Sequence, residues 1–576
     1  MTWRAQTQPS RPAPHGRILR RAVLWVVLLG LVLPILAGSF ETLRAAFGLH
    51  PGIGATRFGL APWQSLAALP GFVTALRLTL FTGIGSAVLA LLLATGFCAL
   101  MHGRVSTRQG DHMLTPILAV PHAAIAIGLA FLIAPSGWIA RLIAPLAGWT
   151  IPPEIASVND SYGLALLLGL IVKELPFLLL VILAALSQLP VNQQLSAGRA
   201  LGYGRGIVWI KVIMPQVWPL IRLPVLVVQA YALSVVDMAV ILGPSNPPTL
   251  AVAVTRWFAN PDVQMILPAS AGAVLIALLT LAATLLWLLA ERVVRAIGLW
   301  WLRRGGRGLS MQPGLLLTAG LAAAALALGL LSLLALLIWS VTHRWSFPHP
   351  LPESWSWQTW HAASWAEAAS YSLLLGCTTT LIATTLAIAW LEAEDRSASP
   401  RAGWATALIY LPLLLPQIAF LYGLNLLFLR IGLSGGLVAV IWGHSLFVFP
   451  YVMIALSDPW RALDPALIRS AASLGAGPNR RLFAVKLPVL LAPILTAAAI
   501  GFAVSIAQYL PTLFLGAGRI ATLTTEAVTL SSSADRRIVG TYASLQAALP
   551  FAAYALALAL PRLIFRNRRA LLGGHA

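Results

Sequence analysis

The stretch Ser196-Ala-Gly-Arg-Ala-Leu-Gly202, which runs on to Pro215, decides how this chain is organised, because it occurs twice. The second copy reads Arg469-Ser-Ala-Ala-Ser-Leu-Gly475 and runs on to Pro488, so the Leu-Gly pair precedes the proline by the same interval in both copies. Each copy lies between long apolar segments and carries positive charge. A polar loop that repeats with fixed internal spacing indicates a tandem duplication, and it favours docking of a two-fold symmetric partner.

The composition of the chain predicts a membrane protein. Of its 576 residues, 59% are hydrophobic and only 10% are charged, and the mean hydropathy is +0.85. A soluble domain carries about 25% charged residues. Apolar stretches of about 20 residues, the length that a helix needs to cross a hydrocarbon layer, recur along the whole chain. A membrane β-barrel would show short alternating strands instead, so we expect an all-α membrane protein.

Twelve membrane spans are predicted, six in each half. They cover residues 22–40, 72–101, 113–134, 163–187, 217–243 and 266–290 in the first half, and 313–340, 365–390, 405–429, 432–457, 487–515 and 541–561 in the second. Each of the spans 217–243 and 487–515 is a candidate for a bent or broken helix. Because each half has an even number of spans, the halves 1–290 and 313–576 are expected to be parallel repeats with the pathway at their interface. The basic, glycine-containing segment 291–312 is expected to be a solvated linker between them.

The distribution of Lys and Arg predicts the topology. With the N-terminus inside, 26 of the 38 Lys and Arg residues fall in inside loops and nine in outside loops. This bias follows the positive-inside rule, so both termini and both repeated loops are expected in the cytoplasm. The net charge of +21 is therefore attributed to membrane orientation, with anionic lipid headgroups rather than nucleic acid as its partner.

The residues of each repeated loop predict a helix, a tight turn and a second short helix. Small residues precede the Leu-Gly pair in both copies and allow close approach of another backbone. Gly202 and Gly475 suit a left-handed helix stop, and Pro215 and Pro488 suit the first turn of the next span. An ordinary amphipathic connector is the alternative for a single loop, and two matched copies disfavour it.

On these residues the chain resembles the permease subunits of binding-protein-dependent ABC importers. Their cytoplasmic coupling loop carries Glu-Ala-Ala, three residues, Gly and a later Leu-Pro, and the resemblance implies that loops 195–215 and 468–488 dock on a cytoplasmic ATPase dimer. The family's glutamate is replaced by Ser196 and by Arg469, which inverts the charge. The candidate coupling residues are Ala197, Arg199, Leu201, Gly202 and Pro215 in the first loop, and Ala471, Leu474, Gly475, Leu487 and Pro488 in the second.

Two coupling loops in one chain resemble the fused, twelve-span permeases of the ferric-iron and thiamine type. Stretches 233–252 and 501–516 are similar to a thiamine-transporter-like branch of them. The resemblance implies two parallel six-helix repeats of the type I importer kind, a location in the bacterial inner membrane and a periplasmic solute-binding protein as partner. Thiamine, ferric iron or another small solute fits this resemblance.

The chain itself is not expected to bind ATP. A phosphate-binding loop of the form Gly-x-x-x-x-Gly-Lys-Ser/Thr needs a lysine after glycine. Val or Ile precedes each of the three lysines, Lys173, Lys211 and Lys486. ATP is therefore expected on the separate ATPase, and no cofactor or metal is expected in this chain.

Polar residues inside the apolar spans are the candidates for the translocation pathway, because ionisable groups in hydrocarbon are costly and usually face the bundle interior or water. Asp237 and Gln508 occupy matching positions of the two repeats, and Tyr509 follows. A polar contact between the halves is the alternative role for this set. The adjacent Lys173 and Glu174 lie either in the pathway or in a structural contact between helices.

Two histidines are further polar residues of the spans. His444 is a candidate for the pathway, at a position comparable to that of Lys173 and Glu174 when the repeats are aligned through Ser187 and Ser457. His122 follows Pro121 and is expected to satisfy backbone carbonyls that the proline frees.

Two other classes of function compete with a permease. An ion-gradient-driven secondary transporter would use Lys173, Glu174 and Asp237 as ion sites, but it leaves the twin loops unexplained. A membrane enzyme would need convergent polar groups at a membrane face.

The tightest acidic set consists of Glu392, Glu394 and Asp395. It is expected to balance Arg396 and Arg401 in a cytoplasmic loop, so the enzyme interpretation is disfavoured.

Overall fold

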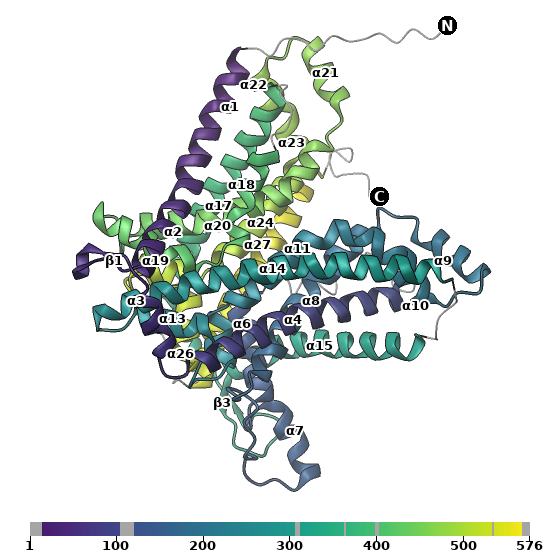
Figure 1. Cartoon of the computed structure of the whole chain (residues 1–576). Coiled ribbons are helices and arrows are strands. Elements are labelled where there is room, and N and C mark those ends of the chain that lie inside the picture. Colours follow the sequence, from purple (N-terminus) through teal and green to yellow (C-terminus); the bar gives the residue numbers. More distant parts are fainter. Residues whose placement is uncertain are drawn as a thin grey trace.

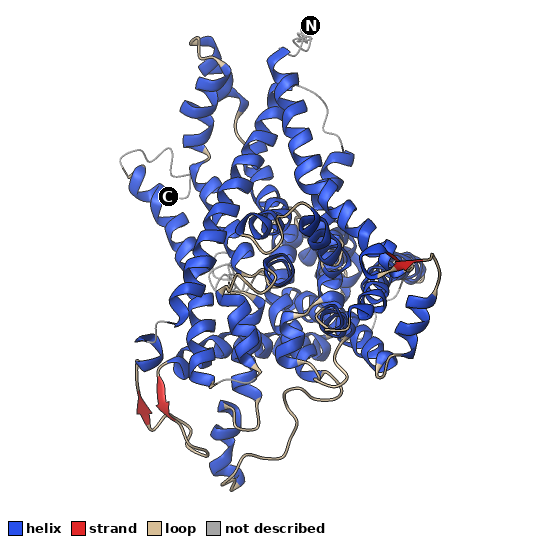
Figure 2. Cartoon of the chain, turned by 90° about the vertical axis from the view of Figure 1, so that its left-hand side faces the viewer, coloured by secondary structure: helices blue, strands red, loops and turns tan. Residues whose placement is uncertain are grey.

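The structure, a computed structural model, is built almost entirely of helices. It describes residues 14–103, 120–305, 311–361, 364–397, 403–532 and 535–566. Within them, strands form only two short antiparallel hairpins, β1–β2 and β3–β4 (Figure 2). The all-α fold class is confirmed.

The elements of the first half of the chain end in one very long helix, α14. In order they are α1 (Pro14–Val27), η1 (Leu28–Val32), α2 (Leu33–Ala46), β1 (Leu49–His50), η2 (Pro51–Ile53), β2 (Ala55–Thr56), α3 (Ala61–Ala68), α4 (Phe72–Met101), α6 (His122–Ile133), α7 (Trp138–Ala147), α8 (Leu164–Leu186), α9 (Val191–Ala200), α10 (Arg205–Val208), η3 (Trp209–Ile213), α11 (Met214–Ser234), α12 (Asp237–Leu242), α13 (Leu250–Phe258), η4 (Val263–Met265) and α14 (Ile266–Arg303). Here η1 and η3 are π-helical turns, and η2 and η4 are 3₁₀ turns.

The second half repeats much of this order. Its elements are α15 (Gln312–Ser340), β3 (Thr342–Arg344), β4 (Ser354–Trp355), α16 (Gln358–His361), α17 (Ser364–Ser397), α18 (Gly403–Leu414), α19 (Ile418–Arg430), α20 (Leu437–Arg461), α21 (Pro465–Ser473), α22 (Pro478–Arg481), η5 (Leu482–Lys486), α23 (Leu487–Val489), α24 (Leu491–Ile506), α25 (Leu510–Gly516), α26 (Leu523–Ser531) and α27 (Arg536–Ile564). The turn η5 is π-helical, like η3.

The helices agree with the predicted spans in number and differ in their continuity. Within the described residues, ten helical stretches are long and apolar enough to cross a membrane, and twelve if each of two bent pairs is one span. One pair, α18 and α19, bends by 96°, and the other, α22–α23 and α24, bends by 75°. The first part of predicted span 113–134 lies outside the described residues.

The segment predicted as a linker is mostly helical. α14 continues the last span of the first half to Arg303, because residues 291–303 contain neither Gly-Gly nor Pro to stop it. Most of its residues beyond Glu291 are exposed, and its role as a solvated linker stays a prediction. The borders of the two repeats at 290 and 313 stay a prediction.

The two halves exchange their first helices. α2 packs on α19 of the second half, and α15 packs on α4, α6 and α8 of the first. The crossings meet at glycines: a Cβ on Gly128 would lie 2.3 Å from the carbonyl oxygen of Ser332, and a Cβ on Gly423 would lie 2.0 Å from that of Gly38. Small residues allow such close backbone contact between membrane helices. The exchange therefore occurs at equivalent points of both repeats.

A second matched contact joins a long helix of each repeat, α4 or α17, to the start of a later short helix, α13 or α26. The hydroxyl of Thr79 on α4 accepts a hydrogen bond of 2.8 Å from the backbone N–H of Leu250, the first residue of α13. The hydroxyl of Ser372 on α17 accepts one of 2.9 Å from the N–H of Leu523, the first residue of α26. An N–H at a helix start has no partner within its own helix, so each hydroxyl satisfies the same orphan donor.

The repeated loops lie at the ends of two diverging groups of helices (Figure 1). One group, with α4, α8, α11, α14 and α15, extends towards α9 and α10, and the other, with α1, α17, α18 and α20, extends towards α21 and α22. The hairpins β1–β2 and β3–β4 and the helix α7 lie at the opposite end, which we call the far end.

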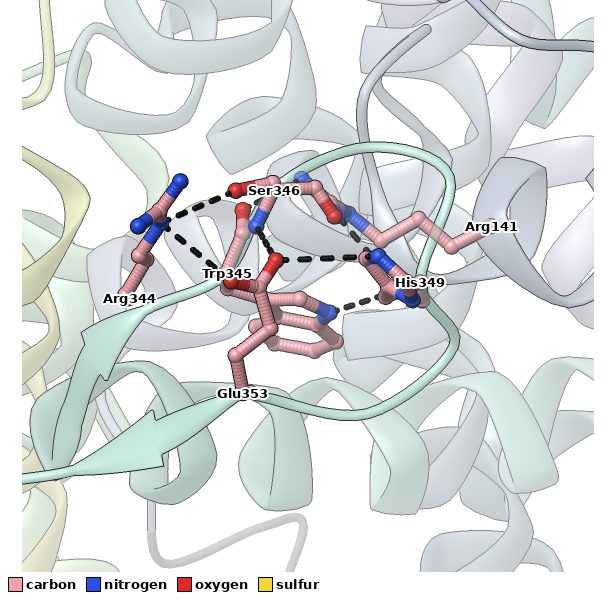
Figure 3. Close-up of polar contacts among 6 residues, drawn as sticks. All are labelled: Arg141, Arg344, Trp345, Ser346, His349 and Glu353. Atoms are coloured by element: carbon pink, nitrogen blue, oxygen red, sulfur yellow. Dashed lines mark hydrogen bonds and ion pairs between the residues drawn. The ribbon is translucent and has the colours of Figure 1, made fainter.

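An arginine joins the two halves at the far end (Figure 3). The buried guanidinium of Arg141, on α7, donates hydrogen bonds to the carbonyl oxygens of Ser346 at 2.7 Å and Trp345 at 3.2 Å in the β3–β4 hairpin. It also lies 5.0 Å from the ring centroid of Trp345, within cation–π distance. The hairpin is closed by Glu353, which accepts a hydrogen bond from the N–H of Ser346 and pairs with Arg344 at 3.2 Å.

Candidate functional site

The two repeated loops have the same backbone geometry. Each runs from a first helix (α9 or α21) through a glycine with φ +80° (Gly202 or Gly475) to a short second helix and a π-helical turn. In the first loop the N–H of Gly202 bonds to the carbonyl of Arg199, and the N–H of Tyr203 to that of Gly198, both at 2.9 Å. The same pair of bonds recurs around Gly475 at 3.0 Å. This is a Schellman motif, so the predicted helix, turn and second helix are observed twice.

The tip of each turn exposes a leucine. Leu201 is 65% exposed and Leu474 is 87% exposed, although leucine favours the interior. Gly202 and Gly475 beside them are also exposed. The two leucines therefore offer the same small apolar contact at the ends of both helix groups.

The other candidate coupling residues flank these tips. Pro215 lies in the first turn of α11, and Pro488 lies in the first turn of α23, as predicted. The exposed residues of the set are Ala197, Arg199 and Pro215, and the half-buried ones are Ala471, Leu487 and Pro488.

At the position of the family's glutamate the loops differ. The hydroxyl of Ser196 donates to the carbonyl of Asn192 at 2.9 Å, within α9. Arg469 is exposed on α21. The two repeated loops are thus alike in backbone shape and different in charge at this position.

The helix carrying Asp237 is broken, as is its counterpart in the second half. α11 ends at Ser234 and α12 begins at Asp237, while α24 ends at Ile506 and α25 begins at Leu510. Asp237, Gln508 and Tyr509 thus lie at matched breaks. Discontinuous helices near the interface of repeats are typical of transporter binding sites, because they free backbone groups for a ligand.

Asp237 belongs to a buried polar cluster of the first half. Its carboxylate accepts a hydrogen bond of 3.4 Å from the phenol of Tyr231 and interacts electrostatically with Lys173. The ammonium of Lys173 donates to the carbonyl of Val120 at 2.6 Å and also interacts with Glu174. Formally, one cation faces two carboxylates there.

His122 and two tyrosines complete this cluster. The imidazole of His122 lies 3.9 Å from Glu174 and 4.5 Å, ring to ring, from Tyr231, so it faces the cluster. From the second half, Tyr451 interacts with Glu174 and Tyr509 with Asp237. Sequence reasoning singled out neither Tyr231 nor Tyr451, since a tyrosine in an apolar span carries no signal without its neighbours.

His444 lies in a separate, uncharged network. Its Nδ1 is 2.9 Å from the hydroxyl of Ser505, and its Nε2 is 2.9 Å from that of Thr512. Thr379 on α17 extends the network by donating to Ser505 at 3.0 Å. The structure therefore does not bring His444 together with Lys173 and Glu174.

The alignment of the repeats through Ser187 and Ser457 is wrong. A Cβ on Gly169 would lie 2.4 Å from the side chain of Leu242, and a Cβ on Gly443 would lie 2.3 Å from that of Leu515. A proline inside the helix follows each of these glycines by seven residues. When the repeats are aligned through Gly169 and Gly443, His444 corresponds to Leu170, one turn before Glu174.

The acidic set of α17 makes more contacts than were expected. Glu392 pairs with Arg396 at 2.7 Å, as predicted, and with Lys486 of η5 at 2.6 Å. Arg401 lies outside the described residues. Within the described part of the chain, no three His, Cys, Asp or Glu residues are grouped to hold a metal ion.

Comparison with known proteins finds two relatives. The inner membrane ABC transporter permease protein YnjC of Escherichia coli (strain K12) is 33% identical over 538 residues, which cover 93% of this chain and 95% of that protein. A spermidine/putrescine transport system permease protein PotC homolog of Mycoplasma genitalium is 29% identical over 159 residues, 27% of this chain and 56% of that protein. No family model matches. Both relatives are transport components rather than enzymes.

Proposed function

The chain belongs to the permease subunits of ABC transporters, and from that premise we propose that it imports a small solute. In this proposal a periplasmic binding protein delivers the solute, and a separate cytoplasmic ATPase dimer binds and hydrolyses ATP. Both termini and both repeated loops face the cytoplasm of the inner membrane. Transport proceeds by alternating access between the two repeats.

The observation that carries this proposal is the exposed leucine at the tip of each duplicated turn. Leu201 and Leu474 lie at equivalent places of two parallel repeats, at the ends of the two diverging helix groups (Figure 1). A dimeric ATPase presents two equivalent surfaces, and two equivalent apolar tips fit them. Because each tip ends a different helix group, movement of the ATPase halves would change the angle between the groups.

The proposed pathway runs between the repeats at the matched helix breaks. Asp237, Glu174 and Lys173 come from the first half, and Tyr451, Gln508 and Tyr509 come from the second. The resemblance to thiamine- and ferric-iron-type permeases makes these two solutes the first to test. Spermidine and putrescine join the panel because of the name of the shorter relative.

The test is co-purification of the solubilised chain with candidate ATPase subunits. We expect the wild-type chain to retain an ATPase and the double variant Leu201→Asp with Leu474→Asp to lose it, because a carboxylate at each tip must be desolvated on docking. Both side chains are exposed, so the variants should fold. Leu146→Asp is the matched control, since Leu146 is 91% exposed on α7 at the far end.

Two outcomes would contradict the proposal. One is equal ATPase binding by the wild type and the double variant, which would remove the role of the loops. The other is solute uptake into vesicles on a proton gradient without any ATPase. That result would favour a secondary transporter with Lys173, Glu174 and Asp237 as its ion sites.

A further inference from the structure

A cation from the docking loop holds the cytoplasmic end of one long helix in each repeat. The helices concerned are α4 and α17, which also carry the matched hydroxyls of Thr79 and Ser372. Ala99 follows Thr79 by 20 residues, as Glu392 follows Ser372, and His102 and Asp395 match in the same way. The ends of α4 and α17 are therefore equivalent sites.

In the first repeat the cation is Arg205, the first residue of α10. Its Nε donates to the carbonyl oxygen of Ala99, and its Nη2 donates to that of His102 at 2.5 Å. The last carbonyls of a helix lack partners within the helix and form the negative end of its dipole. Arg205 thus caps α4 from the loop.

In the second repeat the cation is Lys486, the last residue of η5. Its buried ammonium donates to Glu392 at 2.6 Å and to Asp395 at 2.5 Å. The indole N–H of Trp460, at the end of α20, donates to the same Asp395 oxygen at 3.0 Å. Charge-assisted bonds of this length are among the stronger hydrogen bonds in proteins.

The two cations are not equivalent in sequence. Arg205 follows Gly202 by three residues, where the second loop has Pro478 after Gly475. Lys486 follows Gly475 by eleven residues, where the first loop has the buried Ile213. Equivalent helix ends are therefore bound by different residues. Arg205 lies at the start of the short second helix of its loop, and Lys486 lies after the short second helix of the other loop.

We propose that Arg205 and Lys486 are positioning residues that carry displacement of the docking loops into α4 and α17. They lie between the exposed tips and the membrane spans, and their bonds run to the helix ends directly. α4 packs on α8, which bears Lys173 and Glu174, and α17 packs on α20 and α24, which bear His444 and Ser505. Displacement of either helix end would therefore move the helices that carry the polar groups of the same repeat. This inference rests on the proposed docking of an ATPase.

The test follows the separation of α4 and α17 in the complete permease–ATPase complex. Spin labels on Leu92→Cys and Thr385→Cys report it, because both positions are exposed and both lie seven residues before the matched sites Ala99 and Glu392. The native Cys98 and Cys377 are replaced by Ala. Distances are measured without nucleotide and with ATP, Mg²⁺ and vanadate. We expect the wild-type complex to show a nucleotide-dependent shift.

The decisive variant is Lys486→Met. We expect it to bind the ATPase as tightly as the wild type but to lose at least half of the nucleotide-dependent shift. Arg461→Met is the matched control, because Arg461 pairs with Glu394 of the same helix end at 3.4 Å but belongs to α20 rather than to the loop. It should keep the full shift.

A purely structural role makes a different prediction. Lys486→Met would then lower the melting temperature and leave the shift intact, and this result would overturn the inference. Should Lys486→Met fail to fold, Arg205→Met in the first repeat replaces it: loss of at least half of the shift in a folded complex supports the inference, and a full shift overturns it. A wild-type chain that binds no ATPase would refute the proposed function itself.

Discussion

Single glycines set the distance between the two halves. At Gly128 and Gly423 the backbone of the crossing helix occupies the place of a side chain, with carbonyl oxygens 2.3 and 2.0 Å from an added Cβ. Contacts under 3 Å with backbone atoms can be relieved only if a whole helix moves. These two positions therefore require glycine for packing, whereas at Gly202 and Gly475 the reason is the positive φ.

Replacing these packing glycines should loosen the exchange of first helices. We expect Gly128→Ala and Gly423→Ala each to cost about 1–3 kcal/mol of stability, the usual range for overpacking. Thermal melting in detergent checks this. Gly320→Ala on α15 is the control, because nothing lies within 4 Å of its added Cβ. It should leave the melting temperature unchanged or raise it, since alanine favours helix. Equal melting of all three variants would contradict the observed crossing.

Among the secondary-structure elements, the two repeated loops could be predicted from the sequence, whereas the packing of the helices around them could not. The Leu-Gly turn and the later proline act through local backbone preferences, so Gly202, Gly475, Pro215 and Pro488 sufficed to place helix, turn and re-entry. A break was considered for both spans, but its position after Ser234 was not predicted, because no proline or Gly-Gly marks that place.

Features that depend on tertiary contacts could not be predicted from the sequence. The packing of α2 and α15 on the opposite half leaves no periodic pattern in the sequence of either helix. The cluster of Lys173, Glu174 and Asp237 with Tyr231 and Tyr451 forms only when four separate helices meet. The wrong position of His444 came from matching two serines near helix ends, where insertions shift the register between repeats.

The β3–β4 hairpin should depend on Arg141 from the other half. Arg141→Gln removes the bonds to the carbonyls of Trp345 and Ser346 and the cation–π contacts, so we expect hydrogen exchange in residues 342–355 to rise about tenfold or more, a loss of about 1.4 kcal/mol in local opening. The β1–β2 hairpin is an internal control and should not change. Unchanged hydrogen exchange in residues 342–355 would show that the hairpin is stable without Arg141.

The same hairpin should respond to acid. Hydrogen bonding by Ser346 and the Arg344 cation lower the pKa of the exposed Glu353 carboxyl. A carboxyl with a lowered pKa in the folded state stabilises above its unfolded pKa of about 4.5 and loses this contribution as the pH falls further. Exchange in 342–355 should therefore be faster in Glu353→Gln than in the wild type at pH 7, and this difference should shrink as the pH falls below 4.5 through the lowered pKa of the folded carboxyl. The reverse order would mean that the ionised carboxylate is not a hydrogen-bond acceptor of the hairpin.

Over the whole molecule, the repeats share their backbone plan and differ in charge. The first half holds charged groups at its helix break and the second holds neutral ones, Gln508 and the hydroxyls around His444. At the far end, 30 residues separate α6 from α8, from 134 to 163, whereas only six, from 431 to 436, separate α19 from α20. The extra segment with α7 therefore makes the far ends of the two halves different.

The exchange of first helices implies that the halves can assemble without a covalent link. Residues 1–305 and 311–576, expressed as separate chains, should co-purify, because α2 must pack on α19 and α15 on α4, α6 and α8. A second half shortened to 342–576 lacks α15 and should no longer capture the first half, although it keeps the contacts of α19 with α2. The control is the same pair with the Gly320→Ala change, which should assemble normally. Halves that purify separately would mean that the linker, and not the helix exchange, holds the repeats together. Capture by the shortened half would show that the remaining contacts, chiefly α2 on α19 and α1 on α17, suffice for assembly.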